Sequence, residues 1–203
     1  MNQTLDLSLY KGIIFDLDGT LINSMGAHDV AWEQTCHAFN IPLDVSWVHQ
    51  LGGMPSGKVA VEIVHRYGLE LDPVLLSQDK IARYERLATQ AEVNPQIYQI
   101  LKDHVGLKKL AIGTGGQRKH ALVSLGSSDI PELIDTLVAS DDVANHKPNP
   151  DTFLLAAERI GLAPEHCVVF EDTLIGRQAA HAAGMDCYWV AAGEVAGFYP
   201  CDS

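Results

Sequence analysis

The sequence lacks long hydrophobic runs and any recognisable leader, and both absences narrow the class of protein. Its longest apolar runs are only a few residues, far short of the roughly 20 that a membrane-spanning helix needs. Residues 1–9 show no basic start followed by a hydrophobic region, so we expect neither a secretion signal nor a membrane span. We therefore predict a cytoplasmic protein.

Paired metal-binding motifs are also absent. The four cysteines, Cys36, Cys167, Cys187 and Cys201, form no CxxC pair, and we interpret them as reduced thiols that pack in the interior. None of the nine histidines is spaced as HxxxH or HExxH. These absences argue against a zinc site and against a disulfide framework.

Positive charge is scarce. Fourteen Lys and Arg residues stand against 26 Asp and Glu residues, which gives a formal net charge of −12. This balance argues against nucleic-acid binding, and an anionic ligand would need a local source of positive charge such as Mg²⁺ and one or two lysines. The chain has 203 residues with 47% hydrophobic and 20% charged residues, as in an ordinary soluble globule, and has room for a core with an insertion.

The most informative stretch is KGIIFDLDGTL, residues 11–21. Residues 12–15 are apolar and rich in β-branched and aromatic side chains, which predicts a buried strand. The strand ends at Asp16 and Asp18, and two carboxylates so close to a buried strand repel each other unless a cation lies between them. The alternative for this stretch alone is an ordinary Asp-Gly turn.

Residues 21 to about 90 have helical periodicity and no convincing strand. We predict helices over residues 26–40, over residues 56–67 with Gly68 as the C-terminal cap, and from residue 72 to about 90. The first helix carries His28 and Trp32 on its apolar stripe, and Leu76, Ile81 and Tyr84 belong to that of the third. We therefore predict that residues 21–90 form an all-helical cap domain.

From Asn94 onward, short apolar runs alternate with helical segments. Strands are predicted at residues 109–113, 136–140, 167–170 and 187–190, and helices at residues 95–104, 115–125, 150–160 and 174–183. Together with residues 12–15 they predict an α/β core with five strands in a mainly parallel, doubly wound (Rossmann-like) sheet. This core domain comprises residues 1–20 and 91–203. Residues after Gly193 show no pattern that predicts an element.

Polar side chains follow four of the predicted strands. They are Asp16 and Asp18, Thr114 within a glycine-rich turn, Lys147 in HKPNPD, and Glu171 and Asp172. Because ligands of open parallel sheets bind at the carboxyl ends of the strands, we expect these side chains to form one site.

Chemically, these residue types suit a phosphate ester. A carboxylate such as Asp16 can attack phosphorus, and Asp18 can serve as general acid and base. Thr114, Gly115 and Lys147 can bind the phosphoryl oxygens. We predict Mg²⁺ as cofactor, held by Asp16, Asp18, Glu171 and Asp172.

Each of these residues also has a structural interpretation when taken alone. Thr114 could simply stabilise the glycine-rich turn, and Lys147 could be a loop lysine that precedes proline. Glu171 and Asp172 could cap the helix that follows them. Their joint occurrence at successive strand ends favours the functional interpretation.

The motifs DLDGT, Thr114, HKPNPD and FEDTLIGRQAAHAAGM occur in the order found in the haloacid dehalogenase superfamily, which this chain resembles over essentially its whole length. Within it, the chain is most similar to the β-phosphoglucomutase-like subgroup and its small fructose-1-phosphate phosphatase-like members. The resemblance implies a Mg²⁺-dependent reaction through an aspartyl phosphate on Asp16, beneath a cap that closes over the substrate. His28 matches a family position that contacts the substrate or couples closure of the cap to the general acid, although it could equally pack beside Trp32.

The cap sequence favours hydrolysis. The mutases of the subgroup carry an arginine after the cap glycines that binds a second phosphate, and residues 52–56 here, GGMPS, contain none. Lys58 could replace it or could be a solvated helix residue. We therefore predict a phosphatase that acts on a small sugar phosphate or similar monoester.

Three alternatives stay open on the sequence alone: a sugar-phosphate mutase, a receiver-like phosphoacceptor and an inactive binding module. A receiver would carry its acidic pair before the acceptor aspartate, whereas here that pair comes last. Besides the small-molecule substrate we expect neither nucleic acid nor membrane as a partner. The expected state is a monomer, with a dimer as the alternative.

Overall fold

The computed structural model describes residues 5–88, 92–126 and 128–201. Their elements follow in the order β1 (Gly12–Phe15), α1 (Met25–Ala38), α2 (Val45–His49), α3 (Ser56–Tyr67), α4 (Pro73–Ala88), α5 (Pro95–Asp103), β2 (Lys109–Gly113), α6 (Arg118–Leu125), α7 (Ile130–Leu133), β3 (Thr136–Val138), η1 (Ser140–Asp142), α8 (Asp151–Arg159), η2 (Pro164–His166), β4 (Cys167–Glu171), α9 (Leu174–Ala182), β5 (Asp186–Ala191) and β6 (Glu194–Tyr199).

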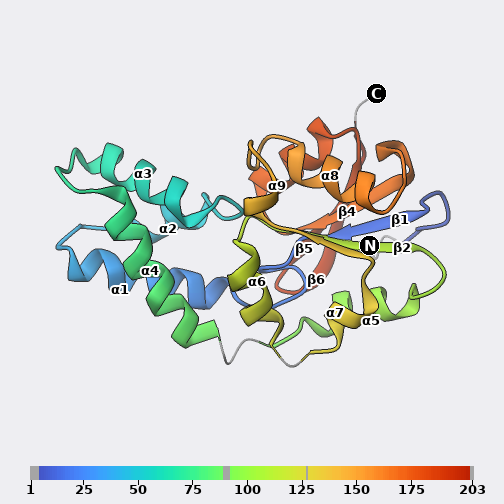
Figure 1. Cartoon of the computed structure of the whole chain (residues 1–203), viewed down its shortest axis with the longest axis horizontal. Helices are drawn as coiled ribbons and strands as arrows, with labels where there is room; N and C mark the ends of the chain where they lie inside the picture. The colour runs from blue at the N-terminus through green and yellow to red at the C-terminus, as the bar shows by residue number, and fades with distance from the viewer. Residues whose placement is uncertain (1–4, 89–91, 127, 202–203) are drawn as a thin grey trace.

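A six-stranded sheet with the order β3-β2-β1-β4-β5-β6 forms the centre of the fold (Figure 1). The first five strands pair in parallel, as predicted, and β1 lies between β2 and β4. The prediction missed β6, which pairs antiparallel with β5 at the edge of the sheet. All six of its residues are partly or fully exposed, so its sequence carries no run of buried apolar residues, and the strand is defined by its pairing with β5.

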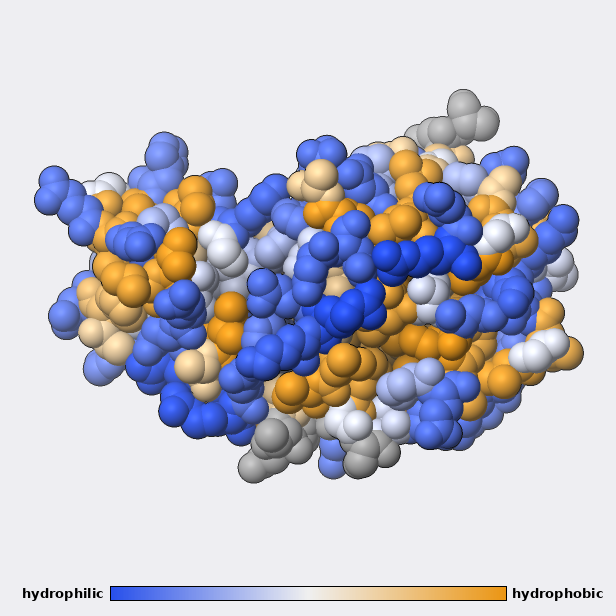
Figure 2. Space-filling model, viewed as in Figure 1, coloured by the Kyte–Doolittle hydropathy of each residue, from blue (hydrophilic) through white to orange (hydrophobic). Residues whose placement is uncertain are grey.

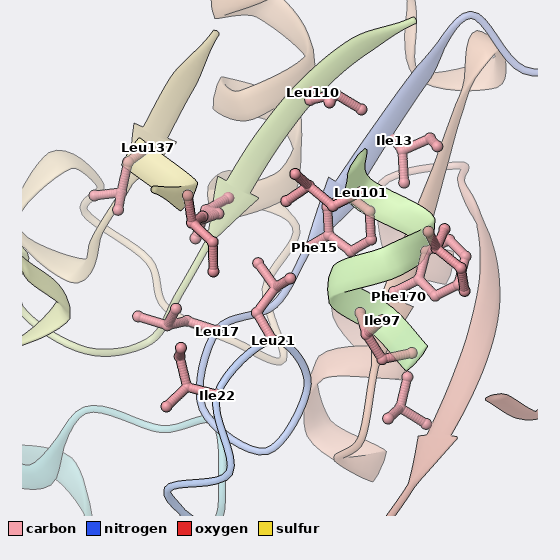
Figure 3. Close-up of a cluster of buried hydrophobic side chains, with 14 of the residues drawn as sticks. Ile13, Phe15, Leu17, Leu21, Ile22, Ile97, Leu101, Leu110, Leu137 and Phe170 are labelled. Carbon is pink, nitrogen blue, oxygen red and sulfur yellow. The ribbon is translucent and has the colours of Figure 1, made fainter. Parts of the chain in front are cut away.

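Both faces of the sheet are covered by helices, because alternate residues of each strand point to opposite faces. From β1, Ile13 and Phe15 pack with Ile97 and Leu101 of α5 (Figure 3). Ile14 packs on the other face in a second cluster that includes α8 and α9. Figure 1 shows α8 and α9 on one side of the sheet and α5 and α7 on the other. This arrangement confirms the doubly wound α/β fold.

Helices α1 to α4 lie together at one end of the molecule (Figure 1). They have an apolar cluster of their own, which includes Trp32, Ile63 and Leu76. Neither α2 nor α7 was predicted, because helices of five and four residues are too short to show helical periodicity. The predicted end of the third helix, near residue 90, lies outside the described residues.

Two further details of the helices differ from the prediction. The buried side of α4 runs through Leu76, Lys80 and Tyr84, whereas Ile81 is only half-buried. Helix α6 begins at Arg118, three residues later than predicted, because Gly115 and Gly116 belong to the turn that follows β2.

The surface view in Figure 2 shows hydrophilic and hydrophobic residues intermixed over the visible face. None of the helices in the described part of the chain combines the length and the apolar character required to cross a membrane. Cys36, Cys167 and Cys187 are buried free thiols, in agreement with their predicted packing role, and Cys201 is partly exposed.

Candidate active site

The carboxyl ends of β1, β2 and β4 meet at one edge of the sheet. β1 leads into Asp16, β2 leads into Thr114, and β4 ends at Glu171. The N–H of Asp16 donates to the carbonyl oxygen of Phe170 at 2.9 Å, which fixes the chain leaving β1 beside the end of β4. The sheet extends from β1 in both directions, through β2 and β3 on one side and through β4 and β5 on the other. Open α/β sheets bind their ligands where the strand order reverses in this way.

Lys147 lies at the centre of this edge and is 1% exposed. Its Nζ donates to Asp16 Oδ1 at 2.6 Å and to Glu171 Oε2 at 2.7 Å. Burial on its own would lower the pKa of Lys147, but the two carboxylates more than offset this effect and raise the pKa above that of an ordinary lysine. Lys147 is therefore a buried cation that compensates part of the negative charge of the two acids it joins.

Three carboxylates lie close together at this edge, and two of them are paired with the lysine. Asp16, Glu171 and Asp172 each offer an oxygen, and these oxygens lie within 4.8 Å of one another. Burial, followed by the charge of Glu171, raises the pKa of both Asp16 and Asp172 well above the ordinary aspartate value. Three acids thus share one lysine, and a second cation would relieve their repulsion. Because Mg²⁺ prefers carboxylate oxygens, the donor set, its spacing and its excess negative charge fit this ion.

Glycine is required beside two of these acids. A Cβ on Gly176 would lie 1.9 Å from Glu171 Oε2, and a Cβ on Gly19 would lie 2.1 Å from Asp172 Oδ2. Gly19 also has a φ of +90°, which side chains other than glycine disfavour. The chain therefore packs against the acids at a distance that no other residue type permits.

Asp18, the predicted fourth metal ligand, is not part of the acidic cluster found among the described residues, and its role as a ligand stays a prediction. Its Oδ1 accepts hydrogen bonds from Ser24 Oγ at 2.6 Å and from Tyr84 Oη at 3.0 Å, and His28 Nε2 lies 3.4 Å away. Burial would raise the pKa of Asp18, but the contacts with His28, Ser24 and Tyr84 lower it below its usual range. Its carboxylate is thus occupied by α1 and α4 and is absent from the cluster of acids found among the described residues.

His28 lies between Asp18 and a lysine that the sequence interpretation overlooked. Lys80 is 1% exposed, and its Nζ lies 2.7 Å from His28 Nδ1 and donates to Ser56 Oγ at 3.2 Å. Burial lowers the pKa of Lys80 to about 7, and the negative charges of Asp18 and Asp29 offset only part of that effect. The sequence did indicate that Lys80 is buried, because it lies four residues after Leu76 and four before Tyr84 and therefore on the apolar side of the helix.

Tyr84 completes the contacts around Asp18. Its ring stacks on His28 with 3.9 Å between the ring centroids, and its Oη is within hydrogen-bonding distance of Ser124 Oγ, at 2.8 Å. Since Tyr84 belongs to α4 and Ser124 to α6, the tyrosine joins the helical part of the chain to the sheet part. The predicted core position of Tyr84 was right, but its polar contacts depend on residues far away in the sequence.

Thr114 lies in the turn after β2 and is 1% exposed. Its Oγ1 accepts a hydrogen bond from the N–H of Gly116 at 3.0 Å, and its N–H donates to Val138 O at 2.9 Å. A Cβ on Gly115 would lie 2.0 Å from the carbonyl oxygen of Gly53, so the loop that precedes α3 approaches this turn very closely.

The basic residues at the start of α6 separate into two groups. Arg118 donates to Asp142 Oδ2 at 2.6 Å, whereas Lys119 Nζ and His120 Nδ1 each lie 3.1 Å from Glu85 of α4. Of these three basic residues, only His120 lines the central cavity.

That cavity, with a volume of about 520 Å³, opens above the strand ends and beneath α1 to α4. Asp16, Asp18 and Thr114 line its floor, and His28 and Lys80 line the opposite wall. This volume is typical of a site for a small molecule. Of the predicted site residues, the structure thus places Asp16, Asp18, His28, Thr114 and Gly115 on the lining of one cavity. Lys147, Glu171 and Asp172 are not among the lining residues and adjoin Asp16 instead.

A fold of this type with buried acids and a lysine at the strand ends defines a class of hydrolases. The sequence matches the haloacid dehalogenase-like hydrolase family over residues 13–190, and the chain belongs to that family. The resemblance found in the sequence is therefore confirmed, and a receiver-like phosphoacceptor is excluded.

Particular relatives narrow the class further. The chain is 36% identical over 177 residues to fructose-1-phosphate phosphatase YqaB of Escherichia coli (strain K12), covering 87% of this chain and 94% of that protein. It is 28% identical over 200 residues to β-phosphoglucomutase of Bacillus subtilis (strain 168), covering 91% and 84% of the two chains. A solved structure of a hydrolase from Pseudomonas syringae superposes with a TM-score of 0.81 at 31% identity, covering 90% of this chain and 85% of that one. These findings identify the chain as a phosphomonoester hydrolase, the predicted enzyme class.

Proposed function

We propose that the protein is a Mg²⁺-dependent phosphatase that releases phosphate from a small sugar phosphate through an aspartyl-phosphate intermediate. The observation that carries this proposal is a group of three closely spaced carboxylates, two of them paired with the buried Lys147, from which Asp16 reaches a cavity of small-molecule size. The similarity to a protein named fructose-1-phosphate phosphatase supports the choice of substrate class.

In the proposed first step, an oxygen of Asp16 attacks phosphorus and the bond from phosphorus to the ester oxygen breaks. Asp16 lines the cavity, and Lys147 holds its Oδ1 at 2.6 Å, which leaves Oδ2 for the attack. Thr114 and the N–H groups of the glycine-rich turn would bind phosphoryl oxygens. The product of this step is a phosphate group on Asp16 and an alcohol.

In the proposed second step, water attacks the phosphorus and regenerates Asp16. Asp18 is the acid and base of the cycle: it gives a proton to the departing ester oxygen and takes one from the attacking water. The contacts from His28, Ser24 and Tyr84 favour the ionised carboxylate, which is the form that accepts the proton from water.

Asp16, Glu171 and Asp172 would hold Mg²⁺, which when bound supplies positive charge against the phosphoryl oxygens. Lys147 remains paired with Asp16 and Glu171, so the chain itself contributes one permanent positive charge beside the ester.

We also propose the division into a core of residues 1–20 and 91–203 and a cap of residues 21–90. The separate apolar cluster of α1 to α3 with Leu76 supports it, whereas the boundary between residues 90 and 91 lies outside the described residues. The cytoplasmic location and the monomeric state stay predictions.

A sugar-phosphate mutase is the second candidate, favoured by the similarity to β-phosphoglucomutase. Against it, residues 52–56 contain no arginine for a second phosphate, and Lys80 is engaged by His28 and Ser56. Isomerisation of glucose 1-phosphates in the presence of a bisphosphate primer, if faster than phosphate release, would reverse this preference.

The test is phosphate release from a panel of esters that includes fructose 1-phosphate, 6-phosphogluconate and p-nitrophenyl phosphate. We expect release from a sugar phosphate, its loss in EDTA, recovery with added Mg²⁺, and loss in Asp16→Asn. Phosphate release undiminished in Asp16→Asn would refute the assigned mechanism.

A further inference from the structure

The helical wall of the cavity carries a hydrogen-bonded pair of a carboxylate and an imidazole that the proposed chemistry does not use. Asp29 of α1 and His49, the last residue of α2, both line the cavity. His49 Nδ1 lies 3.0 Å from Oδ2 and 3.2 Å from Oδ1 of Asp29, so the imidazole faces both carboxylate oxygens. The side chain of Asp29 is 29% exposed and that of His49 is 55% exposed, so both can reach a ligand.

The surroundings of this pair are mostly apolar. Trp32, Val48, Leu51 and Ile81 line the same wall, and Asp29 is the one carboxylate that the described residues of α1 to α4 and their loops contribute to it. Lys80 on this wall is buried and already occupied by His28 and Ser56. The pair therefore offers hydrogen-bonding groups beside an apolar part of the wall, opposite the acids of the floor.

We infer that Asp29 and His49 bind hydroxyl groups at the non-phosphorylated end of the substrate and disfavour a second anionic group there. This inference rests on the proposed phosphatase function and specifies its substrate as a neutral polyhydroxylated monophosphate. An ionised carboxylate accepts hydrogen bonds and donates none, so it recognises hydroxyls and repels a phosphate or a carboxylate. The apolar side chains beside it suit the C–H faces of a carbohydrate.

A positive charge, whose effect on a second phosphate is opposite to that of Asp29, lies on the same wall. Lys58 of α3 is exposed and lines the cavity, and it would attract a second phosphate. The effects of Asp29 and Lys58 oppose each other, and a comparison of mono- and bisphosphates measures which one prevails.

The experiment compares the wild type with Asp29→Asn on fructose 1-phosphate and on p-nitrophenyl phosphate, an ester without hydroxyl groups. We expect the ratio of the KM for fructose 1-phosphate to the KM for the aryl ester to rise about tenfold, the loss expected for one hydrogen bond to a charged group. We also expect fructose 1,6-bisphosphate to inhibit aryl-ester hydrolysis more strongly in the variant, because the repelling charge is gone. His49→Gln should shift the KM ratio in the same direction.

Glu33→Gln is the matched control, because Glu33 lies one turn further along α1, is exposed and is not among the residues that line the cavity. It should leave both KM values unchanged. Equal KM changes for the two esters in Asp29→Asn would indicate a structural role and overturn the inference, as would an unchanged ratio or unchanged bisphosphate inhibition. Failure of the wild type to hydrolyse either ester would instead refute the proposed function.

Discussion

Replacement of Asp16 by Asn should abolish phosphate release and at the same time stabilise the metal-free protein. Asp16 is 3% exposed, and its neighbours within the acidic cluster are Glu171 and Asp172. Asparagine keeps an oxygen that can accept from Lys147 but removes one buried negative charge and the nucleophile.

The magnitude follows from the distances. At the 4.8 Å limit of the cluster, and with an effective dielectric constant of about 20, each repulsion of Asp16 by Glu171 or Asp172 is about 3.5 kcal/mol. The attraction to Lys147 at 2.6 Å is about 6 kcal/mol on the same basis. These contributions nearly cancel, so the remaining cost is the removal of the carboxylate from water, which the neutral amide largely avoids. This agrees with the raised pKa of Asp16, which shows that the fold disfavours its ionised form.

We expect the free energy of unfolding in EDTA to increase by about 1–3 kcal/mol, with about 2–4 °C in Tm for each kcal/mol in a chain of this size. Urea and thermal unfolding would measure it, with Glu165→Gln, an exposed acid, as a control that stays unchanged. Mg²⁺ should then stabilise the wild type by RT ln(1 + [Mg²⁺]/Kd), about 2.7 kcal/mol at 100 times the Kd, and stabilise Asp16→Asn less.

A variant less stable than the wild type in EDTA would show that Asp16 is already fully compensated by Lys147. Equal stabilisation of both proteins by Mg²⁺ would show that Asp16 does not contribute to metal binding. Either result would refute the reasoning from excess buried negative charge.

Three further predictions concern the surroundings of the cluster. Asp18→Asn should lower kcat by about 10²–10⁴-fold with a smaller change in KM, measured by steady-state kinetics, because the acid and base is lost. Lys80→Met should flatten the pH dependence of stability. In the wild type, the pKa of Lys80 is about 7 in the folded state and lies below its value in the unfolded chain, so the folded state loses the proton first as the pH rises. Wild-type stability therefore rises by up to about 1.4 kcal/mol per pH unit between these two pKa values. Gly176→Ala should displace the Glu171 carboxylate, lower Tm, and weaken Mg²⁺ dependence, as seen in unfolding and in activity titrated with the metal.

Matched variants separate these effects from general damage to the fold. Lys58→Met removes an exposed lysine from the same wall and should leave the slope of stability against pH intact. Gly26→Ala places a methyl group where nothing lies within 4 Å and should be neutral or slightly stabilising in α1. A wild-type stability that does not rise above pH 7, or a Gly176→Ala variant as stable and active as Gly26→Ala, would contradict the respective prediction.

The sequence predicted the parallel strands because each is a short apolar run buried on both faces, a pattern that needs no knowledge of its neighbours. It failed at β6, whose partly exposed residues form a strand only because β5 lies beside them. It also predicted Ile81 on the buried side of α4, where Lys80 lies, because hydropathy alone assigns a lysine to solvent. A lysine is buried there only because His28 and Ser56 contact its Nζ, and these contacts join three separate helices.

The sequence by itself determined the order of the chemistry along the chain: Asp16 and Asp18 after the first strand, Thr114 after the second, then Lys147, Glu171 and Asp172. This was possible because parallel strands end at the same edge of a sheet, so residue type and strand position together locate a site. The tertiary structure alone decided how these residues divide their contacts. Lys147 compensates Asp16 and Glu171, whereas Asp18 turns to His28, Ser24 and Tyr84, because the direction of a carboxylate is set by the donors that distant helices bring to it.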